Sequence, residues 1–335
     1  MKRAKMFVVF LVMVSMMLSN YTGLQHVHAE EAEEESIEET AEETEELSSE
    51  VEDGNSNTEI EWVDEPAEFS EPAAYTISDN WNYQIVNGIL TIRGTGSIDD
   101  FSYNNLPPWY SRRSEIDWVE MQNGITRIGA FAFYGLTNVT RVTLSKNLIS
   151  IGAHAFDSCK GITQIVIPDG VTTLGDEDEL GNGGYVFANS GLTSISLPDS
   201  ITNIENGCFM NCKDLASVSL PSHLTAVKKD LFSGCSNLTS VYIPSSVTTI
   251  ELAAFYECTS LTTVAVGSSV TELGRRVFQD CTQLSEVILP KGIETIGQWA
   301  FDACTSLRTV KYGGTQTDWS NITIADGNTP CMMMD

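Results

Sequence analysis

Cysteine is the residue type with the widest chemical repertoire in this sequence. Six of its eight copies recur at one place in a repeated motif. These six are Cys159, Cys212, Cys235, Cys258, Cys281 and Cys304. A thiol can form a disulfide, ligate zinc or act as a nucleophile. Zinc needs ligands that converge on one point, whereas residues at one place in successive repeats form a line. We therefore expect no zinc site among them.

The same alignment favours buried, unpaired thiols. A thiol is a small hydrophobic group that suits a core position, and a disulfide needs a side-chain direction that a regular stack does not offer. Neighbouring turns are expected to lie about 5 Å apart, so distance alone does not exclude a disulfide between them. Cys208 precedes a core phenylalanine and is also expected to be buried. Cys331 lies near the C-terminal end and is the best candidate for a reactive or intermolecular thiol.

Histidine adds little catalytic potential. After residue 29 only His154 and His223 remain, at different repeat positions about three units apart. Neither is expected to meet a nucleophile and an orienting carboxylate, as a catalytic triad requires. The sequence also has no phosphate-binding loop, zinc-protease motif or nucleophile elbow. We therefore predict that the protein is not an enzyme and has no cofactor.

An acidic insertion offers oxygen ligands. Asp176 and Asp178 belong to a run of four acidic residues beside glycines, which makes them candidate calcium ligands. The spacing is not that of an EF-hand, because no glutamate stands at the twelfth position of the loop. A solvated loop is the favoured interpretation, and no metal site is predicted.

A repeat of about 23 residues predicts the secondary structure that positions these cysteine, histidine and acidic side chains. Eight phenylalanines mark it, at Phe133, Phe156, Phe187, Phe209, Phe232, Phe255, Phe278 and Phe301. Cys, Leu, Val and Ile follow most of them at constant offsets, as Cys235, Leu238, Val241 and Ile243 follow Phe232. One such unit cannot enclose a core, but stacked units cover each other's apolar sides. The pattern therefore predicts a solenoid.

Each unit divides into three segments. L-x-x-V-x-I alternates apolar and polar residues, which predicts a half-buried strand and, on stacking, a parallel sheet. V-x-x-I predicts a second short extended or turn segment. A-F-x-x-C closes the coil, and we expect a helical turn there.

This repeat resembles the 23-residue leucine-rich repeat of the BspA-like class, with its signature L-x-x-I-x-L-P-x-x-V-x-x-I-G-x-x-A-F-x-x-C. The resemblance implies an α/β-type, predominantly β solenoid, a right-handed coil with a parallel sheet, capped at both ends. Residues 76–124 resemble the N-terminal capping segment of the family, 125–311 hold about eight repeats, and 312–335 resemble its C-terminal cap with a tail. Members are typically secreted or displayed on microbial surfaces, and some are adhesins.

The first 75 residues differ in composition from the repeats. Residues 1–29 combine a basic start with an apolar run of 13 residues, which predicts a secretory signal peptide rather than a membrane anchor. Residues 30–75 are rich in glutamate and predict a disordered acidic stalk, although calcium or a basic partner is an alternative role. A secreted or cell-surface protein is expected, with no membrane insertion after signal cleavage.

The charge and the outward positions of the sheet define the expected partner. A net charge of −28 argues against nucleic acid and anionic membranes. The predicted strands present a long face of low charge, on which six residues are candidate partner-binding positions: Arg141, Val166, Tyr242, Glu286, Ile288 and Lys311. We expect a monomer that recognises an extracellular protein or glycan, in the manner of an adhesin. The alternative is a structural spacer or envelope-associated module without a specific ligand.

Overall fold

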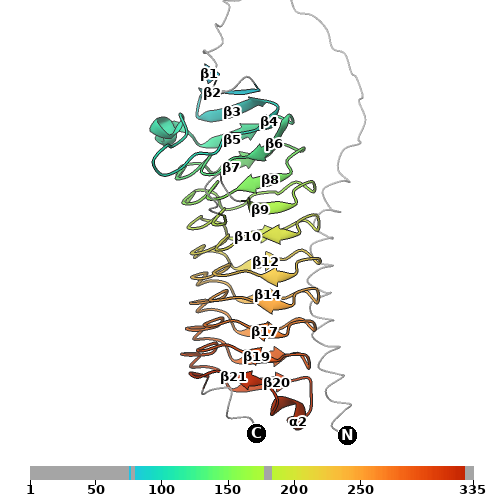
Figure 1. Cartoon of the computed structure of the whole chain (residues 1–335). Helices are drawn as coiled ribbons and strands as arrows, with labels where there is room; N and C mark the ends of the chain where they lie inside the picture. Colours follow the sequence, from blue (N-terminus) through green and yellow to red (C-terminus); the bar gives the residue numbers. More distant parts are fainter. Residues whose placement is uncertain (1–74, 77–79, 177–182, 329–335) are drawn as a thin grey trace, which may run out of the picture. The chain divides into compact units, whose positions relative to one another are not determined.

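The computed structural model describes residues 75–76, 80–176 and 183–328, all within one compact unit, Glu68–Asp335. The described chain is a solenoid of about eight turns with almost no helix (Figure 1). The predicted signal peptide lies outside the described residues, as do residues 30–74 of the predicted stalk, Asp178 and Cys331.

One side of the solenoid, which we call the first face, is formed by the L-x-x-V-x-I segments. Its strands are β5 (Trp118–Met121), β7 (Arg141–Thr143), β10 (Ser194–Ser196), β12 (Ser217–Ser219), β14 (Ser240–Tyr242), β16 (Thr263–Ala265), β18 (Glu286–Leu289) and β20 (Thr309–Tyr312). Their pairings are parallel, and β14, β16, β18 and β20 form one continuous sheet. The predicted strand at residues 163–167 is not formed.

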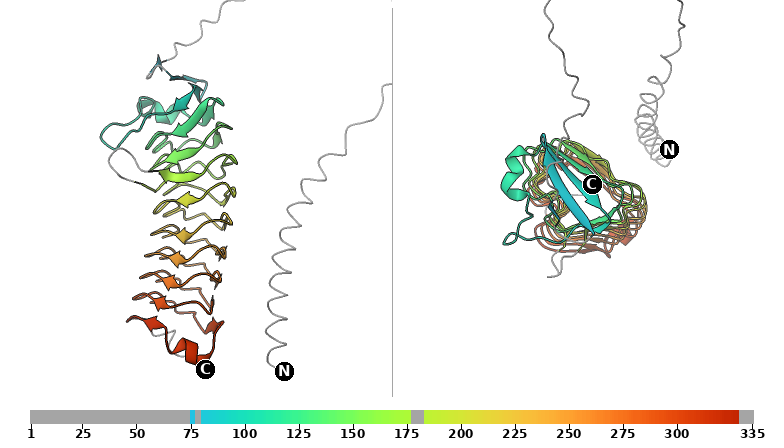
Figure 2. Two further views of the ribbon diagram at one scale, coloured as in Figure 1. Left: turned by 45° about the vertical axis from the view of Figure 1, so that its right-hand side comes forward. Right: turned by 90° about the horizontal axis from the view of Figure 1, so that it is seen from above.

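The V-x-x-I segments form a second parallel sheet, which we call the second face. Its strands are β4 (Gly96–Ser97), β6 (Ile125–Ile128), β8 (Ser150–Gly152), β9 (Thr173–Asp176), β11 (Asn203–Ile204), β13 (Ala226–Val227), β15 (Thr249–Ile250), β17 (Glu272–Leu273), β19 (Thr295–Ile296) and β21 (Thr323–Ile324). They pair in two groups of five. The turns of both faces lie over one another when viewed along the stack (Figure 2).

The A-F-x-x-C segments close each turn without the expected helical turn. Two residues per turn adopt the left-handed conformation, as Ala253 (φ 54°) and Glu257 (φ 57°) do on either side of Phe255. This geometry points the backbone along the stack, so that Phe255 N–H donates to the carbonyl of Val277 in the next turn. Hydrogen bonds between turns therefore replace those of a helix.

The phenylalanines form a continuous stack inside the solenoid. All eight are fully buried, and the ring centroids of Phe209, Phe232 and Phe255 are 5.5 and 5.4 Å apart in succession. Trp109 extends the stack beyond Phe133, and its indole N–H donates to the carbonyl of Ala132. The core thus continues into the N-terminal segment.

Both ends of the stack carry non-repeat structure. At the N-terminal end β1 (Tyr75–Thr76), β2 (Trp81–Val86) and β3 (Ile89–Gly94) pair antiparallel in order, and β3 pairs with β5. A short 3₁₀ helix, η1 (Tyr110–Glu115), follows Trp109. At the other end α2 (Gln316–Trp319) begins with a capping box. Asn328 accepts the Phe301 N–H and so satisfies a donor at the open end.

Candidate functional site

The parallel register of the first face brings several predicted partner-binding residues together. Tyr242 pairs with Ala265, Ala265 with Ile288, and Ile288 with Lys311. In-register residues on adjacent parallel strands lie about 5 Å apart. Tyr242, Ala265 and Ile288 therefore form one short row, which we call the Tyr242 row.

The Tyr242 row has an exposed end and a fixed base. Tyr242 is 59% exposed, whereas Ala265 and Ile288 are half-buried. Beneath the row, Val241, Val264 and Val287 are buried in the core. Because the strands pair in register above a packed core, the row is an apolar surface on a rigid support.

Charged residues border the row at its C-terminal end. Lys311 Nζ lies 2.6 Å from Glu286 Oε2, on the neighbouring strand. Both side chains are partly exposed, so the pair is accessible. The two charges largely offset each other, which leaves this part of the face with a hydrogen-bonding edge of little net charge.

The other two predicted residues lie apart from the Tyr242 row. Val166 is 84% exposed, while Ile165 and Ile167 on either side are buried. The alternation therefore persists there although the chain forms no strand. Arg141 lies at the N-terminal end of the face, with its guanidinium 4.2 Å from the ring centre of Trp118. The structure thus groups four of the six residues and separates two.

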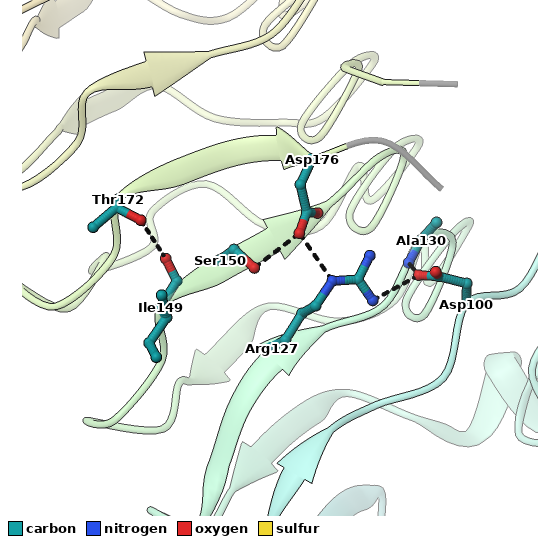
Figure 3. Close-up of polar contacts among 7 residues, drawn as sticks. All are labelled: Asp100, Arg127, Ala130, Ile149, Ser150, Thr172 and Asp176. Atoms are coloured by element: carbon teal, nitrogen blue, oxygen red, sulfur yellow. Dashed lines mark hydrogen bonds and ion pairs between the residues drawn. The ribbon is translucent and has the colours of Figure 1, made fainter. Parts of the chain in front are cut away.

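A charged network on the second face was not predicted from the sequence (Figure 3). Arg127 Nε lies 2.9 Å from Asp176 Oδ2, and its Nη1 lies 2.8 Å from Asp100 Oδ1. Ser150 also donates to Asp176. Burial opposes the charge of Arg127, but hydrogen bonds to Asp100 and Asp176 outweigh it and raise its pKa. The one signal of this network in the sequence was Arg127 itself, because the same position of the next two repeats holds Ser150 and Thr173.

This network gives Asp176, a candidate calcium ligand in the sequence, partners within the protein. Its Oδ2 accepts hydrogen bonds from Arg127 and Ser150. Among the described residues, no three His, Cys, Asp or Glu side chains cluster as a metal site would need. Asp178 lies outside the described residues, so the prediction of a solvated loop without a metal site stays a prediction.

Replacing Arg127 with glutamine is expected to lower the free energy of unfolding by about 2 kcal/mol, because it leaves two partly buried carboxylates without their cation. Urea unfolding followed by circular dichroism measures this. Arg112→Gln is the matched control, since the Arg112–Glu115 pair is exposed and solvent screening leaves it with little effect on stability. Equal effects of the two substitutions would contradict the stabilising role of the network.

The prediction of buried, unpaired thiols is confirmed for the seven cysteines in the described part of the chain. Each of the six aligned thiols donates to the carbonyl of the phenylalanine in the preceding turn, as Cys258 does to Phe232 at 3.2 Å and Cys281 to Phe255 at 3.1 Å. Burial raises the pKa of Cys159 to about 12. These thiols therefore bind the turns together and are poor nucleophiles.

His154 meets a carboxylate, which is one of the two groups that a triad requires. Its Nδ1 lies 2.8 Å from Asp157 Oδ2, and its ring stacks between Phe131 and Tyr185. Ser158, the nearby hydroxyl, donates to Asp157 rather than to the imidazole. The contact arises because both residues lie in the same closing turn, three positions apart. It reproduces the acid–histidine half of a triad without a nucleophile on the imidazole.

The parallel strands, the stacked phenylalanines and the hydrogen bonds between turns define a leucine-rich repeat solenoid. Residues 109–177 and 183–314 match the BspA type leucine-rich repeat region, in six copies. The chain belongs to the BspA type leucine-rich repeat family. This confirms the family and the fold class that the sequence predicted.

Solved structures of leucine-rich repeat proteins are similar to this chain, and the first of the two below supports its fold. A leucine-rich repeat protein from Bacteroides ovatus ATCC 8483 is 19% identical with a TM-score of 0.56, and the match covers 75% of this chain and 77% of that one. A leucine-rich repeat protein from Eubacterium ventriosum ATCC 27560 is 24% identical with a TM-score of 0.43, over 71% of this chain and 84% of that one. The comparison with curated proteins finds no match. At these identities the likeness concerns the fold alone.

The described residues contain no helix that is both long and apolar enough to span a bilayer.

Proposed function

We propose that the protein is a non-catalytic recognition module outside the cell, which binds an extracellular protein or glycan through its first face in the manner of an adhesin. The observation that carries this proposal is the Tyr242 row, an apolar strip on a rigid parallel sheet in which Tyr242 is exposed and Ala265 and Ile288 are half-buried. A tyrosine at the centre of an interface contributes a large contact area and a hydroxyl, and tyrosines are enriched among residues that dominate binding energy. Solenoid faces of this kind suit extended partners.

The side chains of this face support the same proposal. Proteins with this repeat share a fold, but function depends on the side chains that each face presents. On this face the row is bordered by the Glu286–Lys311 pair, which can exchange its mutual contact for hydrogen bonds to a partner. The aligned thiols have raised pKa values and are buried, which makes them unsuitable for catalysis.

A structural spacer is the second candidate, and the hydroxyl side chains favour it. Thr239, Thr262 and Ser285 each donate to a backbone carbonyl of the preceding turn. Hydroxyls used in this way stabilise the stack rather than contact a ligand. A spacer would bind no partner with saturation.

The test begins with the purified protein on arrays of matrix proteins and glycans at physiological salt. For a partner that binds with saturation, the double substitution Tyr242→Ala and Ile288→Ala is expected to weaken binding at least about tenfold, because it removes the apolar anchor. Calorimetric titration measures the change.

Ser217→Ala is the matched control, since Ser217 is exposed on β12, the first-face strand that precedes the strand of Tyr242. It is expected to change affinity less than about twofold, because a lone surface hydroxyl contributes little. Unchanged binding by the double variant would reject the first face as the site. If the folded protein bound nothing on the arrays, the structural-spacer interpretation would be favoured.

A further inference from the structure

A polar pocket of about 590 Å³ lies at the N-terminal end of the first face, where the β2–β3 hairpin meets the first repeats. Its volume falls in the range of small-molecule sites. The side chains that matter here are Thr91, Arg93, Glu120, Thr143 and Lys146. They come from β3, β5 and β7 and from the loop after β7, with Thr91, Glu120 and Thr143 in register across the three strands.

Two glycines bring the walls of this pocket together. Gly94 has φ 120°, a conformation that side chains rarely adopt, and a Cβ on Gly124 would collide with the carbonyl oxygen of Gly94. The loops after β3 and β5 therefore approach closely, at the point where Gly96 N–H donates to Gly124. This junction between the hairpin and the repeats occurs once in the described chain, so its pocket does not recur in the other turns.

Among the described residues, the charged side chains of the pocket have no partner in an ion pair. Arg93 Nε is buried, and no described residue accepts a hydrogen bond from it. Across the described residues, no ion pair joins Arg93, Glu120 or Lys146 to another side chain. A buried donor without an acceptor is costly, and such a donor calls for an explanation such as strain, an ordered water or a bound ligand. A ligand acceptor at the Arg93 guanidinium is one such explanation.

We infer that this pocket binds the hexuronate unit of an acidic glycan. The planar carboxylate of a uronic acid matches the fork of the Arg93 guanidinium, with Lys146 as a second cation. The hydroxyls of the sugar ring are donors and acceptors, which suit Glu120 and the hydroxyls of Thr91 and Thr143. A net charge of −28 disfavours densely sulfated polymers more strongly than a glycan with one carboxylate per disaccharide.

The inference rests on the proposed extracellular role, because that location supplies such glycans. The test uses the full chain and a hexasaccharide of alternating glucuronate and N-acetylglucosamine, titrated by calorimetry at physiological salt. The same hexasaccharide with its carboxylates reduced to alcohols is the matched ligand. We expect the reduced form to bind at least about tenfold more weakly, because the charge-assisted hydrogen bonds are lost.

Protein variants locate the site. Arg93→Gln is expected to weaken binding at least about tenfold and Lys146→Gln about threefold or more. Lys291→Gln is the control, since Lys291 is exposed at the opposite end of the stack, and is expected to change affinity less than about twofold. Lys146 is exposed, so its variant tests the pocket even if Arg93→Gln reduces folding, which unfolding temperature reports.

Several outcomes would overturn the inference. No binding by the native protein, equal binding of the reduced hexasaccharide, or unchanged binding by both pocket variants would each do so. If inorganic sulfate displaced the hexasaccharide as well as free glucuronate does at the same concentration, the pocket would be a simple anion site. That result would reject recognition of the sugar. If an array partner depends on Tyr242 while the native protein does not bind the hexasaccharide, the pocket inference fails and the proposed function stands.

Discussion

Replacing Phe232 with alanine should lower the free energy of unfolding by about 3–5 kcal/mol. The ring is fully buried between Phe209 and Phe255, at centroid distances of 5.5 and 5.4 Å. The turns cannot close the gap, because hydrogen bonds such as Phe232 N–H to the Ala254 carbonyl fix their spacing. The lost burial and the remaining cavity therefore add to each other.

Urea unfolding followed by far-ultraviolet circular dichroism measures this loss. Each turn contacts mainly its neighbours, so the defect is also expected to divide the transition into two steps. Tyr242→Ala is the matched control, since it removes an aromatic ring of similar size from an exposed position, and should change stability by less than about 1 kcal/mol. A loss below that value for Phe232→Ala would mean that the phenylalanine stack is not the main source of stability.

The second large effect is expected at alkaline pH, where the protein should lose stability steeply. Burial raises the pKa of Cys159, Cys212 and Cys304 to about 12, and holds those of Cys235 and Cys258 well above the ordinary value. An unfolded thiol has a pKa of about 8.5. Below that value both states are protonated, and the thiols do not affect the folding equilibrium.

Above pH 8.5 the sign follows from the proton count. The unfolded state releases thiol protons that the folded state retains, so rising pH favours unfolding until the folded pKa is passed. Each thiol removes about 1.4 kcal/mol per pH unit in this window. Several aligned thiols together would exhaust the typical stability of a domain, about 5–15 kcal/mol, within roughly two pH units.

Urea midpoints at pH 7, 9 and 10 under reducing conditions measure this dependence. The variant Cys258→Ala is the informative comparison, because it removes one buried thiol and leaves the others in place. It should reduce the slope above pH 9 by about 1.4 kcal/mol per pH unit. It should also cost about 1 kcal/mol at pH 7 through the lost thiol contact. A stability that is constant up to pH 11 would show that the thiols ionise without unfolding.

Positions that recur with the repeat could be predicted from the sequence. The phenylalanine spacing placed the core, and the shared cysteine position placed a line of buried thiols, both of which the structure confirms. The register of Tyr242, Ala265 and Ile288 also follows from the 23-residue spacing. Periodicity succeeds here because each turn stacks on an almost identical turn, so the environment of one position is repeated in the next.

Positions that occur once were decided only by the tertiary structure. Arg127 bridges Asp100 and Asp176, which lie 27 and 49 residues away in the sequence. Arg93 lines a pocket because a non-repeat hairpin packs on the first turns. The physical reason is that such contacts depend on the lateral offset of the turns and the geometry of the end segment, and neither recurs with the repeat. The sequence by itself thus determined the solenoid and its core, and three-dimensional packing decided which polar side chains meet.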